Sequence, residues 1–185
     1  MAVSSSFSSL RIFNVGLSNC LRSVLVFCAS VFVGTALAAE EDTIRAAYLY
    51  NFAKYIQWPD EQRSALRLCI VGDDDHDSAF ESLNGKPVRD MKVSVRRAVN
   101  VPEIPQCDLL FVPAKYTDLL ERVRRAIDGY PILVVTESSD SLPKGAMIAM
   151  IRSENHIVFE VDVIAVRQAG LQASGKMLQL ARKVY

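Results

Sequence analysis

The sequence is poor in the residues and motifs on which enzymes depend. It contains two histidines, and neither belongs to a motif that binds a metal or activates a nucleophile. A Gly-x-Ser-x-Gly elbow, a phosphate-binding loop, a Gly-x-Gly-x-x-Gly fingerprint and a His-Glu-x-x-His pair are all absent. The 21 basic residues are balanced by 21 acidic ones and form no basic stripe, which disfavours nucleic acid as a partner. These absences favour a binding protein rather than an enzyme.

One acidic stretch, GDDDHD at 72–77, resembles a metal cluster but fails the calcium-loop template. That template requires glycine at its sixth position and glutamate at its twelfth, where this chain has Ser78 and Asn84. A solvated turn at the start of a helix explains the stretch better. We therefore expect neither a metal nor a cofactor.

The first 38 residues have the features of a secretory signal peptide. Their only charged residues are Arg11 and Arg22, and an uncharged, largely apolar run of 16 residues follows, SVLVFCASVFVGTALA. This run is shorter than the roughly 20 residues that span a bilayer. Ala36-Leu37-Ala38 is a small-x-small cleavage site. We expect cleavage after Ala38, export, and a mature domain of residues 39–185 with a net charge of −2, an uncleaved membrane anchor being the alternative.

Cysteine is scarce, and only Cys69 and Cys107 of the four cysteines lie beyond residue 38. In an exported protein an even pair of cysteines favours a disulfide. A bridge between two positions 38 residues apart would stabilise the fold by roughly 4 kcal/mol in the chain-entropy model. Two buried free thiols and a metal-binding pair are the alternatives.

The pattern of apolar residues predicts a single α/β domain. Continuous apolar runs predict buried strands at 66–72, 107–113 and 131–137, and an alternating run predicts a strand at 91–99. Helices are expected at 43–57, near 77–85 and at 115–129, and a hairpin is expected across Ser153-Glu154-Asn155. One or two helices end the chain, with Ser174 as the cap of the second. The prediction is a mostly parallel, mixed sheet flanked by helices, with a C-terminal hairpin and then a helix.

Three stretches of the mature chain are similar to the YfiR family of small exported bacterial proteins. They are IRAAYLYNFAKYIQWP (44–59), CDLLFVP (107–113) and the long segment 145–184. The last segment carries a pattern formed here by Phe159, Val161, Asp162, Ala165, Leu180, Ala181 and Arg182. Met177 stands where the family pattern has its first leucine, which is a mild departure.

This resemblance implies a periplasmic repressor of a membrane diguanylate cyclase. Such a repressor binds the periplasmic sensor domain of the cyclase and keeps its catalytic domain inactive, which lowers cyclic-di-GMP output and biofilm formation. The resemblance also implies a homodimer, an outer-membrane lipoprotein that sequesters the repressor, and a family disulfide at Cys69–Cys107. It names neither the particular cyclase nor the signal.

Two other classes of function stay open at this point. A small-ligand sensor would bind a metabolite at the carboxyl ends of the strands, around Gly72-Asp73 and Pro113. A small molecule retained by the purified protein would favour that hypothesis. A hydrolase or redox enzyme would require a reactive cysteine, which thiol titration would detect.

Five of the fifteen aromatic residues lie in the first predicted helix and the Trp-Pro that follows it. At about 100° per residue, one face of this helix contains Ile44, Tyr48 and Phe52, and we expect that face to cover the sheet. Tyr50 is expected on the polar side, and Trp58 is expected to follow the helix at the sheet edge. These two aromatics are candidates for a partner contact at the margins of the helix.

The main candidates for partner binding lie near the other end of the chain. Along the expected strand HIVFEVDV, Glu160 lies on the face opposite the one that carries Phe159 and Val161. Apolar residues beside charges suit an interface, so we predict a partner contact that involves Glu160, Val166 and Leu171. The alternative is that Glu160 and its neighbour Asp162 only solvate a face of the sheet.

Overall fold

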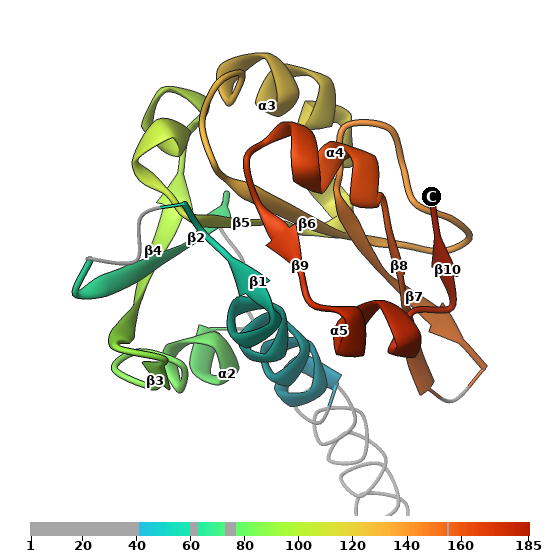
Figure 1. Ribbon diagram of the computed structural model, residues 1–185, viewed down its shortest axis with the longest axis horizontal. Coiled ribbons are helices and arrows are strands. Elements are labelled where there is room, and N and C mark those ends of the chain that lie inside the picture. Colours follow the sequence, from blue (N-terminus) through green and yellow to red (C-terminus); the bar gives the residue numbers. More distant parts are fainter. Residues whose placement is uncertain (1–40, 60–62, 73–76, 155) are drawn as a thin grey trace, which may run out of the picture. The chain divides into compact units, whose positions relative to one another are not determined.

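Runs of valine, isoleucine and leucine build the central sheet of this protein (Figure 1). The computed structural model describes residues 41–59, 63–72, 77–154 and 156–185. Within these ranges the main sheet has eight strands in the order β10-β8-β7-β6-β5-β2-β4-β3. They are β2 (Ala65–Val71), β3 (Pro87–Val88), β4 (Met91–Val99), β5 (Leu109–Val112), β6 (Leu133–Ser138), β7 (Ile148–Ser153), β8 (His156–Val161) and β10 (Lys183–Val184).

The five central strands are parallel, and the margins of the sheet make it mixed. Strands β4, β2, β5, β6 and β7 pair in parallel. At one margin β3 is antiparallel to β4, and at the other β8 is antiparallel to β7 while β10 is parallel to β8. Every residue of β5 is buried, as expected for a strand covered on both faces. The predicted mixed α/β sheet with its C-terminal hairpin is therefore confirmed.

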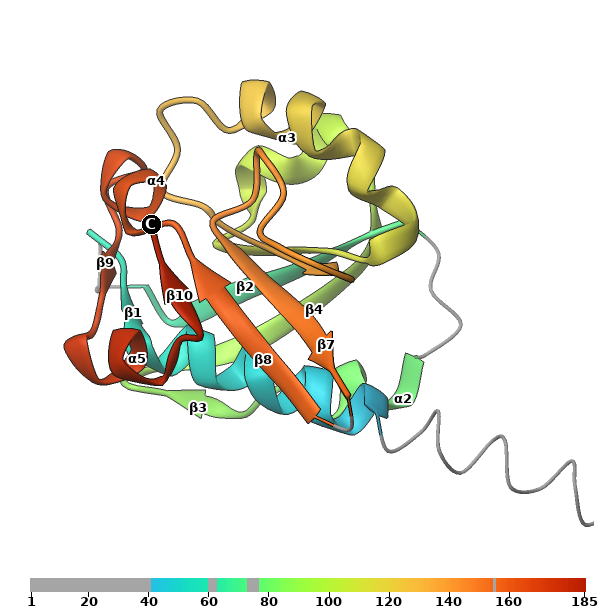
Figure 2. The same cartoon turned by 90° about the vertical axis from the view of Figure 1, so that its right-hand side faces the viewer.

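Helices cover both faces of the sheet (Figure 2). Residues 41–55 are helical, and we call this segment the aromatic helix. It lies with α2 (Asp77–Glu81) on one face, and α3 (Leu120–Ala126) lies on the other. The 3-10 segments η1 (Val101–Gln106) and η2 (Ala114–Leu119) contact α3. The helix predicted at 115–129 is thus a 3-10 segment followed by a shorter α-helix. All helices within the described ranges are too short or too polar to cross a membrane.

The chain ends with two short helices, α4 (Val163–Gln168) and α5 (Gly175–Leu180). Asp162 caps α4 by accepting a hydrogen bond from the backbone of Ala165 at 2.8 Å, and Ser174 caps α5 as predicted. Between the helices, β9 (Gln172–Ala173) pairs with β1 (Ile56–Gln57) in a separate two-stranded sheet. Neither β9 nor β10 was expected from the sequence.

The aromatic helix buries a stripe that is rotated from the predicted one. Ala46, Leu49, Phe52 and Ala53 are buried, whereas Ile44 is 41% exposed, so the prediction for Ile44 was wrong. Spacings of three and four residues place the buried side chains on one stripe centred on Leu49. The ring of Phe52 contacts that of Phe159 on β8 edge to face, with centroids 5.2 Å apart.

Candidate functional site

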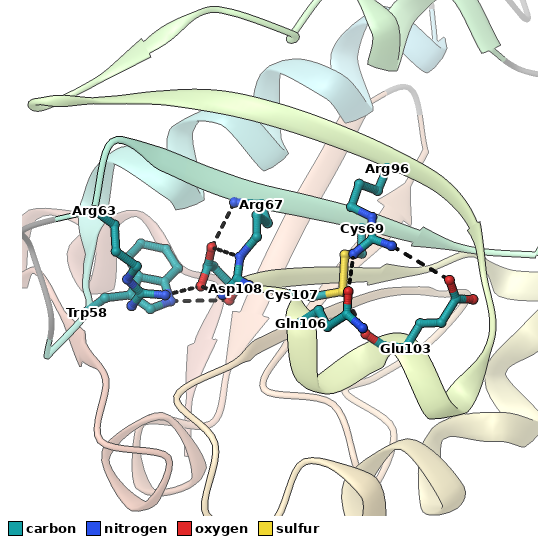
Figure 3. Close-up of polar contacts among 9 residues, drawn as sticks. All are labelled: Trp58, Arg63, Arg67, Cys69, Arg96, Glu103, Gln106, Cys107 and Asp108. Carbon is teal, nitrogen blue, oxygen red and sulfur yellow. Dashed lines mark hydrogen bonds and ion pairs between the residues drawn. A yellow bond between two sulfur atoms is a disulfide. The ribbon is translucent and has the colours of Figure 1, made fainter.

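Cys69 and Cys107, the two cysteines beyond residue 38, form the predicted disulfide (Figure 3). Cys69 lies on β2 and Cys107 lies just before the neighbouring strand β5, and their Cα atoms are 5.8 Å apart. Both residues are buried. The pair is therefore oxidised in this structure rather than two free thiols or a pair of metal ligands. It joins two adjacent strands of the core.

A buried carboxylate follows the disulfide directly. Asp108 is 3% exposed and accepts hydrogen bonds from the backbone N–H of Arg67 at 2.8 Å, from Arg67 Nε at 3.0 Å and from Arg67 Nη2 at 2.9 Å. Arg63 forms a further ion pair with the same carboxylate (Figure 3). The hydrogen bond to Asp108 is the main reason that the pKa of Arg67 is raised. Sequence reasoning missed this cluster.

Trp58, a predicted partner-binding residue, belongs to the interior of this cluster. Its side chain is 4% exposed, and its indole Nε1 donates a hydrogen bond to the backbone oxygen of Asp108 at 3.2 Å. The indole thus closes the amino end of β5. A contact between Trp58 and a partner stays a prediction, and it would require the indole to become accessible.

Tyr50 lies where the aromatic helix meets β3. Its hydroxyl donates to the backbone oxygen of Pro87 at 2.6 Å. The ammonium groups of Lys54 and Lys86 each lie 5.5 Å from the centre of its ring, within the range of cation–π attraction. The ring is only partly exposed, so the prediction of an exposed Tyr50 overlooked its docking against β3. Both lysines are exposed.

Glu160 is an internal residue that holds three segments together. It is 3% exposed and accepts hydrogen bonds from Arg182 Nε at 3.1 Å and Nη2 at 2.7 Å, from the Tyr185 hydroxyl at 3.0 Å and from the Leu142 N–H at 2.9 Å. Burial acts to raise the pKa of Glu160, but these hydrogen bonds outweigh it and the pKa is lowered. The alternative of a solvated Glu160 is excluded.

Val166 and Leu171, predicted with Glu160 to contact a partner, are also buried. Their exposures are 0% and 1%, and the Leu171 N–H donates to the Val166 carbonyl at 3.1 Å. They connect α4 to β9 inside the C-terminal segment. A partner contact by Glu160, Val166 and Leu171 stays a prediction. In this structure all three side chains are buried beneath the surface of the C-terminal segment.

The same segment also holds most of the exposed large apolar residues. Among the described residues, six large apolar side chains are exposed, and four of them lie after residue 163. We call these four the C-terminal apolar strip: Ile164 (58%), Leu180 (65%), Val184 (42%) and Tyr185 (40%). The Tyr185 carbonyl accepts from the Val163 N–H at 3.2 Å, which places the end of the chain beside the start of α4. β10 is an edge strand, so its outer side is open.

A cavity of about 230 Å³ lies at the carboxyl ends of β5 and β6. Its walls carry charges of both signs, including Glu41, Arg45, Glu137 and Arg152, beside apolar atoms of Met150 and other residues. Burial acts to lower the pKa of Arg45, but Glu137, the largest opposing influence, and the acidic residues of the same helix raise it. These charges mostly neutralise one another.

The predicted ligand position beside this cavity is occupied by a side chain. Gly72 follows β2 with φ of +72°, and a Cβ on it would lie 2.2 Å from the ring of Tyr116. The ring therefore packs directly against the backbone at the point between β2 and β5 where the strand order reverses. Asp73, the other half of that predicted site, lies outside the described residues.

No group of three or more histidine, cysteine or acidic residues within the described ranges is placed to hold a metal ion. The candidate binding regions are therefore the C-terminal apolar strip, the margin of the aromatic helix and the charged cavity.

One family model, described as YfiR/HmsC-like, matches residues 42–182.

Proposed function

The chain belongs to the YfiR/HmsC-like family, and on that premise we propose that it is an exported inhibitor of a membrane diguanylate cyclase. The family is regulatory and non-catalytic, and membership supports a role in the regulation of cyclic-di-GMP signalling in general. In the proposal, residues 39–185 act in the periplasm, bind the periplasmic sensor domain of the cyclase and lower cyclic-di-GMP output and biofilm formation. The family match is the single observation that carries the proposal.

The C-terminal apolar strip is the surface that we assign to the cyclase. Large apolar side chains beside an open edge strand can be buried by a partner, and each newly buried CH₂ group contributes about 0.8 kcal/mol before the cost of association. Two buried residues hold parts of the strip: Glu160 accepts a hydrogen bond from the Tyr185 hydroxyl, and Val166 is the buried residue of the helix that carries Ile164. Substitution of those residues would therefore weaken binding indirectly, by shifting the strip.

Calorimetric titration of the mature chain, purified from the periplasm, against the sensor domain of a candidate cyclase tests this function. Leu180→Ser is expected to weaken binding by about tenfold or more. Ile44→Ser, at an exposed apolar position on the aromatic helix, is the matched control and should leave binding unchanged. If wild-type protein, folded and oxidised, does not bind, that cyclase is not the partner. If both substitutions weaken binding equally, the C-terminal apolar strip is not part of the interface.

Two accompanying proposals concern assembly. We propose that the protein forms a homodimer, and that an outer-membrane lipoprotein sequesters it from the cyclase. Light scattering of the mature chain tests the first. Competition between the lipoprotein and the cyclase domain for the mature chain tests the second.

The charged cavity supports a second candidate, a sensor of a small periplasmic ligand. Its volume of about 230 Å³ is smaller than the roughly 300–1,000 Å³ of typical ligand pockets, so it suits only a very small molecule, and its walls carry charged groups of both signs. Native mass spectrometry of protein purified without added ligand would detect a retained molecule. A molecule whose retention is lost in Arg152→Ala would support the sensor, and a wild-type protein of the bare chain mass would count against it.

A further inference from the structure

We propose that one side of β2 and β4 is a docking surface for an acidic segment of a protein partner. This basic sheet face consists of Arg63, Arg67, Lys92, Ser94 and Arg96. Three strands, β5, β6 and β7, separate β2 from β8 in the sheet, so the face lies far from the C-terminal apolar strip. The inference goes beyond the proposed function, because it describes a second interface of different chemistry.

The strand register gathers the basic residues on one side of the sheet. Arg67 pairs with Ser94, while Lys92 pairs with Ala65 and Arg96 pairs with Cys69. Paired residues of neighbouring strands project to the same side, so Lys92 and Arg96 flank the position beside Arg67. The alternate residues of β4, Met91 and Val93, are buried on the opposite side. The four steps of chain from Lys92 to Arg96 span about 13 Å in extended conformation.

Asp108 fixes the guanidinium groups of this face from beneath. It is buried, and Arg67 bonds to it through Nε and Nη2, which leaves Nη1 without a hydrogen bond to any described residue. Arg67 is nevertheless 38% exposed. Arg96 donates to Gln106 at 2.9 Å and lies 3.6 Å from the Glu103 carboxylate (Figure 3). The arginines are thus held in place before any partner arrives, which reduces the entropy cost of binding.

The face retains a surplus of positive charge. Among the described residues, its four cations meet two carboxylates, those of Asp108 and Glu103, which is an excess of two positive charges within that part of the chain. Lys92 is exposed and forms no ion pair with the described part of the chain. Surplus cations arranged in a row attract a partner that carries several negative charges.

The geometry favours an acidic protein segment over a free phosphate or a lipid surface. One phosphate cannot span the row from Lys92 to Arg96, and the charged cavity described above is lined by other residues. Arginine forks match carboxylates in paired hydrogen bonds. The exposed large apolar residues of the described chain all lie outside β2 and β4, although surfaces that enter a membrane interface carry such residues.

Fluorescence anisotropy with a labelled peptide of ten glutamates tests this inference on the mature, oxidised chain at low ionic strength. The double variant Lys92→Glu/Arg96→Glu is expected to weaken peptide binding by about tenfold or more. Arg167→Glu/Lys176→Glu changes the net charge equally at exposed positions of α4 and α5, and it should weaken binding less than twofold. Should the double variant fail to fold, Lys92→Glu alone, at an exposed position, gives the same comparison.

The proposal also predicts a role for the shape of the arginine. Arg67→Lys keeps the positive charge but removes the planar guanidinium group. This substitution should weaken binding of the peptide by about threefold. Failure of wild-type protein to bind the peptide, or equal losses in the two double variants, would overturn the proposal. So would binding of phosphatidylglycerol vesicles or inorganic phosphate at this face in preference to the peptide.

Discussion

Replacing Glu160 by glutamine tests whether a buried ion pair holds the end of the chain on the sheet. Glu160 accepts from Arg182, Tyr185 and the Leu142 backbone, all within 3.1 Å. Glutamine has nearly the same shape but no charge, and it turns one of the two acceptor atoms into a donor. At least one of the three partners must then lose its hydrogen bond.

The expected loss of stability follows from the burial of each partner. Breaking a fully buried ion pair costs about 3–5 kcal/mol, because the remaining charge is left without compensation. Arg182 is 39% exposed and also donates to the Asp140 carbonyl at 2.7 Å, so it regains contact with water at lower cost. We expect Glu160→Gln to lower the free energy of unfolding by about 2 kcal/mol, and Glu160→Ala by about 3 kcal/mol.

Urea unfolding followed by the fluorescence of Trp58, the single tryptophan, measures this loss. Glu81→Gln is the control, because Glu81 pairs with Arg97 but is 52% exposed. A surface pair of this kind contributes about 0–1 kcal/mol. If Glu160→Gln costs no more than Glu81→Gln, the buried ion pair does not hold the terminal strand, and the account of Glu160 given above is wrong.

Three further predictions concern acid, the disulfide and a glycine. Because the pKa of Glu160 is lowered, its contribution to stability is present above its unfolded pKa of about 4.3 and is lost as the pH falls through its folded pKa. The difference in urea stability between wild type and Glu160→Gln should therefore shrink below about pH 4, and a constant difference from pH 7 to pH 3 would contradict this. Reduction of the Cys69–Cys107 bridge should lower stability by up to about 4 kcal/mol, and urea unfolding of a Cys69→Ala/Cys107→Ala variant should not respond to the reductant. Gly72→Ala should lower the free energy of unfolding by at least about 1 kcal/mol more than Gly129→Ala. Both glycines have positive φ, but only at Gly72 would the added Cβ collide with the ring of Tyr116. Equal melting temperatures of the two variants would refute this packing argument.

Apolar runs predicted the inner part of the sheet because β5 and most of β6 are buried on both faces. Strands such as β5 need no information from distant parts of the chain to be recognised. The two-residue strands β9 and β10 were missed, because two residues carry no periodicity. The bonded disulfide was predictable from cysteine count and the expectation of export.

The burial of the predicted site residues was not foreseen, for a physical reason that concerns distance along the chain. Alternation along β8 put Glu160 on an outer face, and that would hold for an isolated hairpin. Arg182 and Tyr185 return from more than twenty residues away and cover it. Likewise, nothing local to Trp58 indicates a hydrogen bond to Asp108, which is 50 residues away. Tertiary contacts of this kind override any pattern read from one segment.

The aromatic helix imposes an order on the assembly of the molecule. A chain that is made from its amino end contains this helix early, yet two of its main contacts, those with Ile157 and Phe159 on β8, come near the end of the chain. The Tyr48 hydroxyl donates a hydrogen bond to the Ile157 carbonyl, which is 109 residues later. Strand β1, which follows the helix, pairs with β9 near the end of the chain. Contacts of such long range cannot form until nearly all of the polypeptide has emerged, and they slow folding. The aromatic helix therefore cannot pack fully until its late partners are present. The complete fold requires nearly the whole chain.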